Sequence, residues 1–179
     1  MIQSIKKFLS KWINAVKSYA DPKHITNMYE QDSSIQVTTC LDNNTDLVIK
    51  FHYELCKHEF DTLAQQGIFS KHYQIVDPVL KNCVVFLKDC IPFGFAEIEF
   101  IDYHNSPDIE ARVVSFYVKP EARGIGLEDK AFSCIENLVK YHYGANIITF
   151  DVFVHNIEAR KFYMSQGLQP VKVELSKKL

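Results

Sequence analysis

The sequence predicts a mixed α/β domain whose central sheet is mostly antiparallel and contains one parallel pair of strands. Three observations support this fold class. The chain has 179 residues, 47% of them hydrophobic, which is enough to fill one sizeable core. Three strand patterns follow one another over residues 83–118, as in an antiparallel meander. A helical pattern then separates the strand patterns at 111–118 and 147–154, which predicts a parallel pair with a right-handed crossover.

Composition and charge argue against several classes of function. The chain has 20 Lys and Arg against 22 Asp and Glu, whereas nucleic-acid-binding domains usually carry a basic excess, so we expect no nucleic-acid partner. No stretch approaches the roughly 18 uninterrupted apolar residues of a membrane-spanning helix. The five cysteines form no C-x-x-C pair, and residues 1–20 lack a signal-peptide h-region. We therefore expect reduced thiols and a cytoplasmic location.

Residues 2–20 have the apolar spacing of an amphipathic helix, with four lysines and no acidic residue among the first twenty. Asp21-Pro22 ends the pattern, because the residue before proline avoids helical geometry. We interpret residues 1–30 as a helical extension and linker that precede a domain at 31–179. The helix has three candidate docking surfaces: its own domain or a sister subunit, a partner protein, and an anionic membrane. The first is favoured, and the membrane surface is not.

The other elements follow from apolar spacing, helix caps and turn residues. Strands are predicted at 35–41, 83–88, 93–101, 111–118, 147–154 and 168–175, and helices at 45–65, 127–143 and 156–166. Asn44 or Thr45 caps the first of these helices and Asn156 caps the last. Gly144 and Gly167 are natural C-terminal stops.

The turn at 119–126, KPEARGIG, joins an apolar strand to a helix and carries the clearest binding signal in the chain. Glycine permits backbone conformations closed to other residues and lets a ligand approach the main chain. The first amides of the following helix have no internal partner and, together with the helix dipole, form an anion site. Taken alone, the turn fits a diphosphate site or simply a tight connection.

Two motifs along the chain resemble those of the GNAT superfamily, the acetyl-CoA-dependent N-acetyltransferases. The family's loop motif is Arg or Gln, any two residues, Gly, any residue, then Gly or Ala; here Arg123 takes the first place and Gly126 the fourth. The family's helix motif is Asn-x-x-Ala-x-x-x-Tyr-x-x-x-Gly. It is matched here by Asn156, Ala159, Tyr163 and Gly167. The close resemblance covers about residues 111–175.

The resemblance implies a GNAT-type sheet with helices on both faces and a parallel pair that splays apart to hold the pantetheine arm of acetyl-CoA. Backbone groups of Phe116, Tyr117 and Val118 would pair with this arm. The pyrophosphate would be bound by the amides of Arg123, Gly124, Ile125, Gly126, Leu127 and Glu128. Asn156 would hydrogen-bond the cofactor. Tyr163 would lie near the thiol and protonate it as it leaves.

The implied reaction is direct acetyl transfer to an amine on a small molecule or a peptide, with a backbone N–H polarising the thioester carbonyl. Two candidates for the general base are Glu110 and Glu99. Glu97, which shares a predicted strand face with Glu99, and His155 are further candidates. Arg112 stands where many relatives carry a glutamate.

Glu128 departs from the loop motif, because the family has Gly or Ala in this place. Two like charges about 4 Å apart repel by roughly 1 kcal/mol in water and up to about 4 near a protein surface. Acidic residues in a first helical turn are, however, stabilising by about 0.3–1 kcal/mol. The departure defines an alternative function: a catalytically weak or inactive GNAT-fold binding or scaffold protein whose N-terminal helix docks a partner or a membrane. Transfer of a longer acyl group is a third alternative.

We predict no metal site. His52 and Cys56 lie four residues apart on a predicted helix, but a third and fourth ligand are not evident. A packed side-chain pair is the favoured interpretation.

Overall fold

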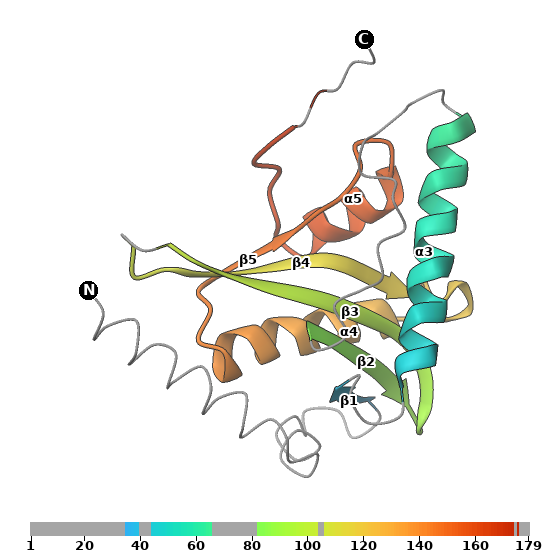
Figure 1. The fold of residues 1–179 in the computed structure, drawn as a ribbon, viewed down its shortest axis with the longest axis horizontal. Coiled ribbons are helices and arrows are strands. Elements are labelled where there is room, and N and C mark those ends of the chain that lie inside the picture. Colours follow the sequence, from blue (N-terminus) through green and yellow to red (C-terminus); the bar gives the residue numbers. More distant parts are fainter. Residues whose placement is uncertain (1–34, 40–43, 66–81, 104–105, 174, 176–179) are drawn as a thin grey trace.

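The computed structural model describes residues 35–39, 44–65, 82–103, 106–173 and 175. The predicted helix at 2–20 and the domain boundary at residue 30 lie outside these residues. The elements, shown in Figure 1, are β1 (Ile35–Thr39), α3 (Thr45–Gln65), β2 (Cys83–Lys88), β3 (Ile91–Asp102), β4 (Ile109–Val118), the 3₁₀ turn η2 (Pro120–Ala122), α4 (Leu127–Asn137), the π-helical turn η3 (Leu138–His142), β5 (Ile147–Phe150) and α5 (Ile157–Ser165).

The sheet has five strands in the order β1-β2-β3-β4-β5. The first three pairings are antiparallel and the last, between β4 and β5, is parallel, which confirms the predicted fold class. Asp89 and Cys90 have positive φ angles of 51° and 63°, as the two-residue turn between β2 and β3 requires.

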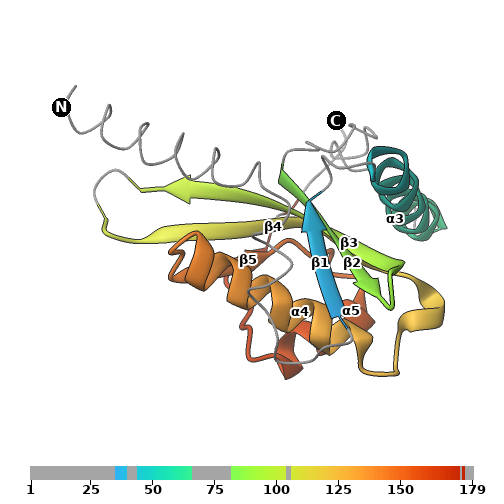
Figure 2. The ribbon, with the colours of Figure 1, turned by 90° about the horizontal axis from the view of Figure 1, so that it is seen from below.

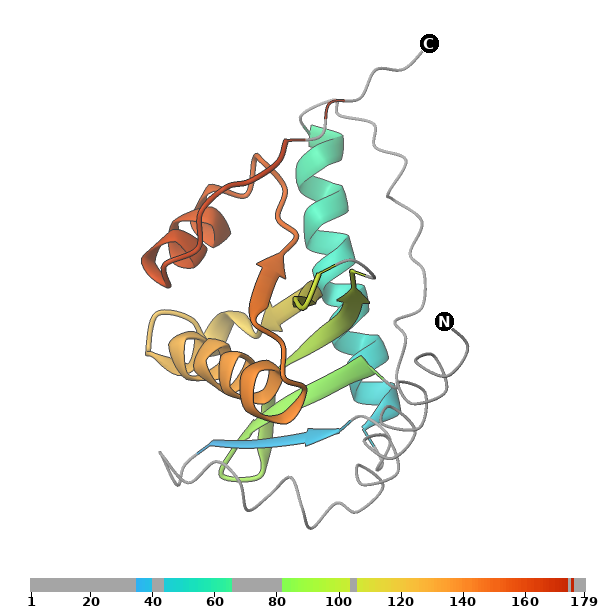
Figure 3. The same cartoon turned by 90° about the vertical axis from the view of Figure 1, so that its left-hand side faces the viewer.

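Helices cover both faces of the sheet. Figures 2 and 3 show α3 on one face and α4 and α5 on the other. On the first face, Val48 and Phe51 of α3 pack with Phe95 and Tyr117 of the sheet. The core on the second face is larger, and α4 supplies Leu127, Ala131 and Ile135 to it. The apolar side chains of α3 and α4 recur at helical spacing, and this periodicity is the reason both helices lie against the sheet.

The parallel pair comes apart part-way along β4. Residues 110–113 of β4 pair with 147–150 of β5, and the N–H of Asp151 donates the last bond, 3.3 Å long, to the carbonyl of Val113. The register with β3 shifts at the same point, which leaves Val114 as an extra residue. Such a bulge bends the strand and strengthens its twist. β4 then continues to Val118 without β5, and Figures 1 and 3 show the two arrows pointing apart.

Three predicted elements differ from the structure by more than two residues. The final strand at 168–175 is wrong, since residues 168–173 and 175 form no ladder. Val171 and Leu175 are each 89% exposed, so the apolar alternation that predicted a strand packs against nothing described. The strand predicted at 147–154 stops at Phe150, where its pairing with β4 ends. The helix predicted at 127–143 changes to π geometry after Asn137.

Candidate active site

The free edge of β4 is the first component of the site. The N–H of Lys119 donates to the carbonyl of Phe93, 2.9 Å away, which directs the backbone groups of Lys119 toward β3. Backbone groups alternate in an antiparallel ladder, so those of Val118 and Phe116 face away from β3. β5 has already ended there, so both backbone groups of Phe116 and the N–H of Val118 are available to a ligand that lies along β4, whereas the carbonyl of Val118 is bound by the Arg123 side chain. They belong to two of the three residues predicted to bind the pantetheine arm.

The turn after β4 forms the second component. Gly124 and Gly126 have φ angles of 69° and 82°, in the left-handed region that side chains disfavour. The N–H of Lys130 is the first to donate to a carbonyl, that of Gly126, so the earlier amides of α4 lack a helical acceptor. The N–H of Arg123 donates instead to Pro120, 3.2 Å away. The predicted anion site therefore retains the amides after Gly124 but not that of Arg123.

Glu128 is bound to this turn. One of its carboxylate oxygens accepts a 2.8 Å hydrogen bond from the backbone N–H of Gly124. The side chain thus bends back from the first turn of α4 and binds an amide that the resemblance assigns to the pyrophosphate. The contact stabilises the turn by the same charge–amide chemistry that an anionic ligand would use.

Arg123 acts on the turn through its side chain. Its Nε donates to the carbonyl of Val118, 2.9 Å away, and its guanidinium lies 5.9 Å from the centre of the Tyr117 ring. The hydroxyl of Tyr117 donates to Glu54 of α3 at 2.7 Å. Burial, followed by this hydrogen bond, raises the pKa of Tyr117. Arg123 and Tyr117 thereby connect the end of β4 to both the turn and α3.

Tyr163 lies in an aromatic cluster beside the point where the strands part. Its ring centre is 4.8 Å from that of Phe150 and 6.4 Å from that of Phe116, and Phe162 stacks on Phe116 at 6.3 Å. Only 9% of Tyr163 is exposed. Burial, followed by the negative charge of Glu59, raises its pKa, so the hydroxyl keeps its proton at neutral pH. A buried, protonated phenol is suited to donate a proton.

Asn156 begins α5, as predicted. Its Oδ1 accepts from the N–H of Ala159 at 3.2 Å, which satisfies one of the free amides of the helix. The oxygen is therefore used in the cap, while the side-chain amide nitrogen donates to no other described residue. That nitrogen is the atom through which Asn156 could contact a cofactor.

Glu110, a predicted base, lies near the start of β4, whereas the turn follows the end of that strand. Eight residues of strand, about 26 Å, separate it from Val118. Glu110 is buried and accepts from the hydroxyls of Tyr103 and Thr149, with the Arg112 guanidinium 3.6 Å away. Burial alone would raise its pKa, but these partners lower it. Because both oxygens of the Glu110 carboxylate already accept hydrogen bonds, this side chain is suited to hold neighbouring strands together and not to act as a catalytic base.

Glu99 and Glu97 occupy neighbouring positions on the α3 side of β3. Glu99 is exposed and stands opposite Arg112 in the ladder. Glu97 is only 6% exposed, lies at the bulge, and accepts from the hydroxyl of Ser115 at 3.5 Å. Of the two, Glu97 is nearer to the point where the strands part.

Glu59 of α3 was missed at the sequence level. Helical spacing places Glu59 on the same side of α3 as the apolar residues Val48, Phe51 and Leu55. A search of this side for apolar residues alone does not select it. Burial raises the pKa of its carboxyl to about 7. A carboxylic residue in line with an apolar helix face is the signal that could have found it.

His52 and Cys56 form the predicted side-chain pair, with Nε2 and Sγ 3.3 Å apart. Burial, and then the charge of Glu59, raises the pKa of the Cys56 thiol. Cys56 therefore stays protonated at neutral pH and is a poor nucleophile. Across the residues that the structure describes, no group of three or more His, Cys, Asp or Glu side chains is placed to hold a metal ion.

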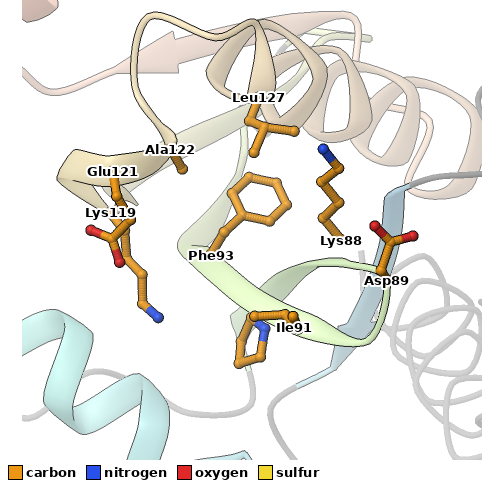
Figure 4. Close-up of a pocket in the computed structure, with 9 residues that line it drawn as sticks. Lys88, Asp89, Ile91, Phe93, Lys119, Glu121, Ala122 and Leu127 are labelled. Carbon is orange, nitrogen blue, oxygen red and sulfur yellow. The ribbon is translucent and has the colours of Figure 1, made fainter.

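A separate pocket of about 300 Å³ lies between the β2–β3 turn and the start of the 119–126 turn (Figure 4). Phe93 and Leu127 supply apolar walls, and Lys88 and Glu121 supply charge. Leu127 is the one predicted site residue in its lining, and the pocket does not include the aromatic cluster around Tyr163.

Comparison with known proteins identifies the family to which this arrangement of strands, turn and helices belongs. A model of the acetyltransferase (GNAT) family matches residues 45–168, which include α3, β2 to β5 and α5. This chain belongs to the GNAT family. An uncharacterized N-acetyltransferase, YycN of Bacillus subtilis (strain 168), is 29% identical over 125 residues, or 70% of this chain and 74% of YycN.

Solved GNAT-like structures share the fold at lower identity. The tetramutant of BH1408 from Bacillus halodurans has a TM-score of 0.65 and 18% identity, covering 81% of this chain and 99% of its own. Arabidopsis thaliana Naa50, in complex with the bisubstrate analogue CoA-Ac-MVNAL, has a TM-score of 0.54 and 16% identity, covering 78% of this chain and 85% of its own. Of the helices described for this GNAT chain, none is long and apolar enough to cross a membrane.

Proposed function

We propose that this GNAT protein is an N-acetyltransferase that moves the acetyl group of acetyl-CoA directly to an amine. One observation carries the proposal: the free edge of β4 leads at one end into a turn whose amides after Gly124 have no helical acceptor, and Phe116 on this strand contacts the buried ring of Tyr163. An elongated ligand with an anionic end and a reactive far end matches these features. Family membership supports acetyl-CoA as that ligand.

The residues present fit acetyl-CoA. The amides of Gly126, Leu127 and Glu128 would hold the pyrophosphate, since they have no helical acceptor. A side chain built at Gly124 or Gly126 would meet nothing within 4 Å, so open space adjoins the turn. The outward backbone groups of Phe116 and the N–H of Val118 would pair with the pantetheine arm, and Asn156 would donate from its Nδ2.

Acetyl-CoA supplies an activated acyl thioester when bound. Tyr163 would donate its hydroxyl proton to the leaving sulfur, since it lies buried beside the point where the strands part and keeps its proton at neutral pH. A backbone N–H beside the bulge at Val114 would polarise the thioester carbonyl. The protonated state of Cys56 supports transfer without an acyl-cysteine, because a thiol is a weak nucleophile.

An amine on a small molecule or a peptide is the acceptor we propose. Naa50 was crystallised with an analogue that joins CoA to a peptide, which supports a peptide N-terminus as one acceptor class. Glu97, which lies at the bulge on the α3 side of β3, would favour a cationic amine.

Calorimetric titration with acetyl-CoA tests the proposal. We expect saturable heat and a rise in melting temperature, followed by release of free thiol when a polyamine, an aminoglycoside or a peptide with a free N-terminus is added. Absence of both heat and thermal stabilisation at millimolar acetyl-CoA would contradict it.

A second candidate is a GNAT-fold binding or scaffold protein with little or no activity. The hydrogen bond between Glu128 and Gly124 favours this candidate, because it fills one amide of the phosphate turn. Residues 2–20 would then dock a partner, a sister subunit or a membrane surface. Deletion of residues 1–22 would abolish such an interaction, while Tyr163→Phe would change nothing measurable.

A further inference from the structure

The side chain of Arg123 reaches from the turn back to Val118, the last residue of β4. Its Nε donates to the carbonyl of Val118 at 2.9 Å, and this contact is partly buried. The guanidinium also lies 5.9 Å from the centre of the Tyr117 ring. One side chain thus bonds the backbone of β4 and lies over an aromatic ring of the same strand, so it fixes the start of the turn to the end of β4.

Tyr117 is itself held by α3. It is only 5% exposed, and its ring centre lies 5.4 Å from that of Phe51 in α3 and 6.4 Å from that of Phe95 in β3. Its hydroxyl donates a 2.7 Å hydrogen bond to the carboxylate of Glu54, which follows Phe51 by three residues on the same helix. Hydrogen bonds to an ionised acceptor are stronger than those between neutral groups, so this contact anchors the phenol to α3.

Glu54, Tyr117 and Arg123 form a continuous set of contacts, the α3–turn network, in which each contact strengthens the next. The Glu54 carboxylate attracts the hydroxyl proton of Tyr117 and so makes the phenol ring richer in electrons. A ring that is richer in electrons attracts a cation more strongly, and the cation over this ring is the Arg123 guanidinium. Polar contacts in series polarise one another in this way. The negative charge of Glu54 on α3 therefore affects how firmly Arg123 holds the end of β4.

The α3–turn network joins the two faces of the sheet. α3 covers the face on which the Tyr117 ring packs, whereas the turn leads into α4 on the other face, as Figures 2 and 3 show. Arg123 directly precedes Gly124, and the amides after Gly124 have no helical acceptor. Glycine makes this turn conformationally permissive, so contacts outside the glycines are needed to hold its amides in one arrangement. The network supplies such a contact from the α3 side.

We propose that Glu54 and the side chain of Tyr117 are positioning residues for acetyl-CoA, which act through Arg123 to hold the turn with its amides aligned for the pyrophosphate. This inference rests on the proposed function. The effect of the two side chains is indirect, since they contact each other under α3 and belong to no part of the turn. Helix α3, which supplies no amide to the turn, thereby contributes to the affinity for the cofactor.

The test compares the wild-type chain with Tyr117→Phe, which keeps the packed ring, and with Glu54→Gln, which keeps an acceptor and removes the charge. Tyr143→Phe is the matched control. Its ring also packs in the core, 4.1 Å from that of Phe100, and it follows the π-helical turn at the far end of the helix that begins with α4. Each protein, with and without the additional change Arg123→Ala, is titrated with acetyl-CoA by calorimetry. Solvent exchange of the Arg123 Nε–H, followed by NMR without ligand, gives a readout independent of acetyl-CoA.

We expect Tyr117→Phe to raise the dissociation constant of acetyl-CoA about fivefold and Glu54→Gln to raise it about twofold, while Tyr143→Phe binds as the wild type does. In the Arg123→Ala background, Tyr117→Phe should have no further effect, because the residue through which Tyr117 acts is gone. The Arg123 Nε–H should exchange slowly in the wild type and in Tyr143→Phe, and about tenfold faster in Tyr117→Phe.

Three outcomes would overturn the inference alone. The first is an affinity for acetyl-CoA that is unchanged in both Tyr117→Phe and Glu54→Gln, or lowered equally in Tyr117→Phe and Tyr143→Phe. The second is additive losses from Tyr117→Phe and Arg123→Ala, which would mean that the two side chains act independently. The third is an Arg123 Nε–H that exchanges equally fast in the wild type and in Tyr117→Phe. Failure of the wild-type protein to bind acetyl-CoA would instead overturn the proposed function, and this inference with it.

Discussion

The Glu128 carboxylate accepts a 2.8 Å hydrogen bond from the backbone N–H of Gly124, inside the turn that is the proposed site for the pyrophosphate of acetyl-CoA. An internal anion therefore competes with the proposed ligand for one donor. Ligand binding requires this bond to break or to coexist with a second negative charge nearby. Both alternatives cost free energy that a glycine or alanine at this position would avoid.

Replacing Glu128 should strengthen acetyl-CoA binding. We expect Glu128→Gly to lower the dissociation constant about tenfold, and Glu128→Gln to have a smaller effect because an amide oxygen can still accept from Gly124. Titration calorimetry measures both. Glu136→Gln, exposed and further along α4, serves as the control and should bind as the wild type does. Unchanged or weaker binding by Glu128→Gly would mean that this side chain does not obstruct the site.

Tyr163→Phe should separate catalysis from binding. The substitution keeps the ring packed on Phe150 and Phe116 and removes only the proton donor. We expect kcat to fall about 10²-fold while acetyl-CoA affinity stays within twofold. Tyr141→Phe, at a tyrosine that is 68% exposed, is the control. A variant that retains full kcat would rule out Tyr163 as the acid.

Gly126→Ala should impair the turn by strain rather than by crowding. A Cβ at Gly126 meets nothing within 4 Å, but φ is 82°. The left-handed conformation costs an alanine about 1–2 kcal/mol, which we expect both in unfolding free energy and as weaker acetyl-CoA binding. Gly144→Ala has similar strain at φ 68°, away from the turn, and should lose stability alone. Equal losses of affinity in the two variants would contradict a special role for the turn.

Glu110 should matter to stability and not to cofactor binding. The folded pKa of this carboxyl is lowered, so its stabilising effect is present above the unfolded pKa of about 4.3 and is lost as pH falls through the folded value. We expect Glu110→Gln to cost about 1–3 kcal/mol at pH 7 by chemical denaturation, with the difference shrinking toward pH 3. Acetyl-CoA affinity should not change. A constant difference across pH would show that the charge of Glu110 is not what stabilises the fold.

Gly126, Asn156 and Tyr163 lie in the turn and helices that the sequence predicts for them, whereas no motif indicates the position of Glu59. Gly126, Asn156 and Tyr163 belong to contiguous motifs whose spacing follows from local turn and cap geometry, and the described fold agrees with the elements assigned to them. The position of Glu59 depends instead on how α3 crosses β3 and β4, a long-range packing relation. A local sequence pattern does not indicate which carboxylate is buried when α3 packs on β3 and β4.

Two other differences between the sequence-based predictions and the structure also have physical causes. Alternation over 168–175 describes which side chains share a face, but a strand also needs a neighbour to bond with, and β5 ends after four residues. Glu128 was anticipated as a charge near the phosphates. Its bond to Gly124 depends on a side-chain rotamer that bends back over the turn, and motif spacing carries no information on this rotamer.

Val114 is an extra residue in β4 with no partner in β3, so deleting it would change the path of the strand. Val113 faces α4 and Ser115 faces α3, so joining them directly would preserve the inside–outside pattern of the whole strand. The deletion would nevertheless remove the bend and let β4 stay alongside β5. A loss of three nucleotides, with no change in any other side chain, would thus close the gap between β4 and β5 that the proposed ligand requires.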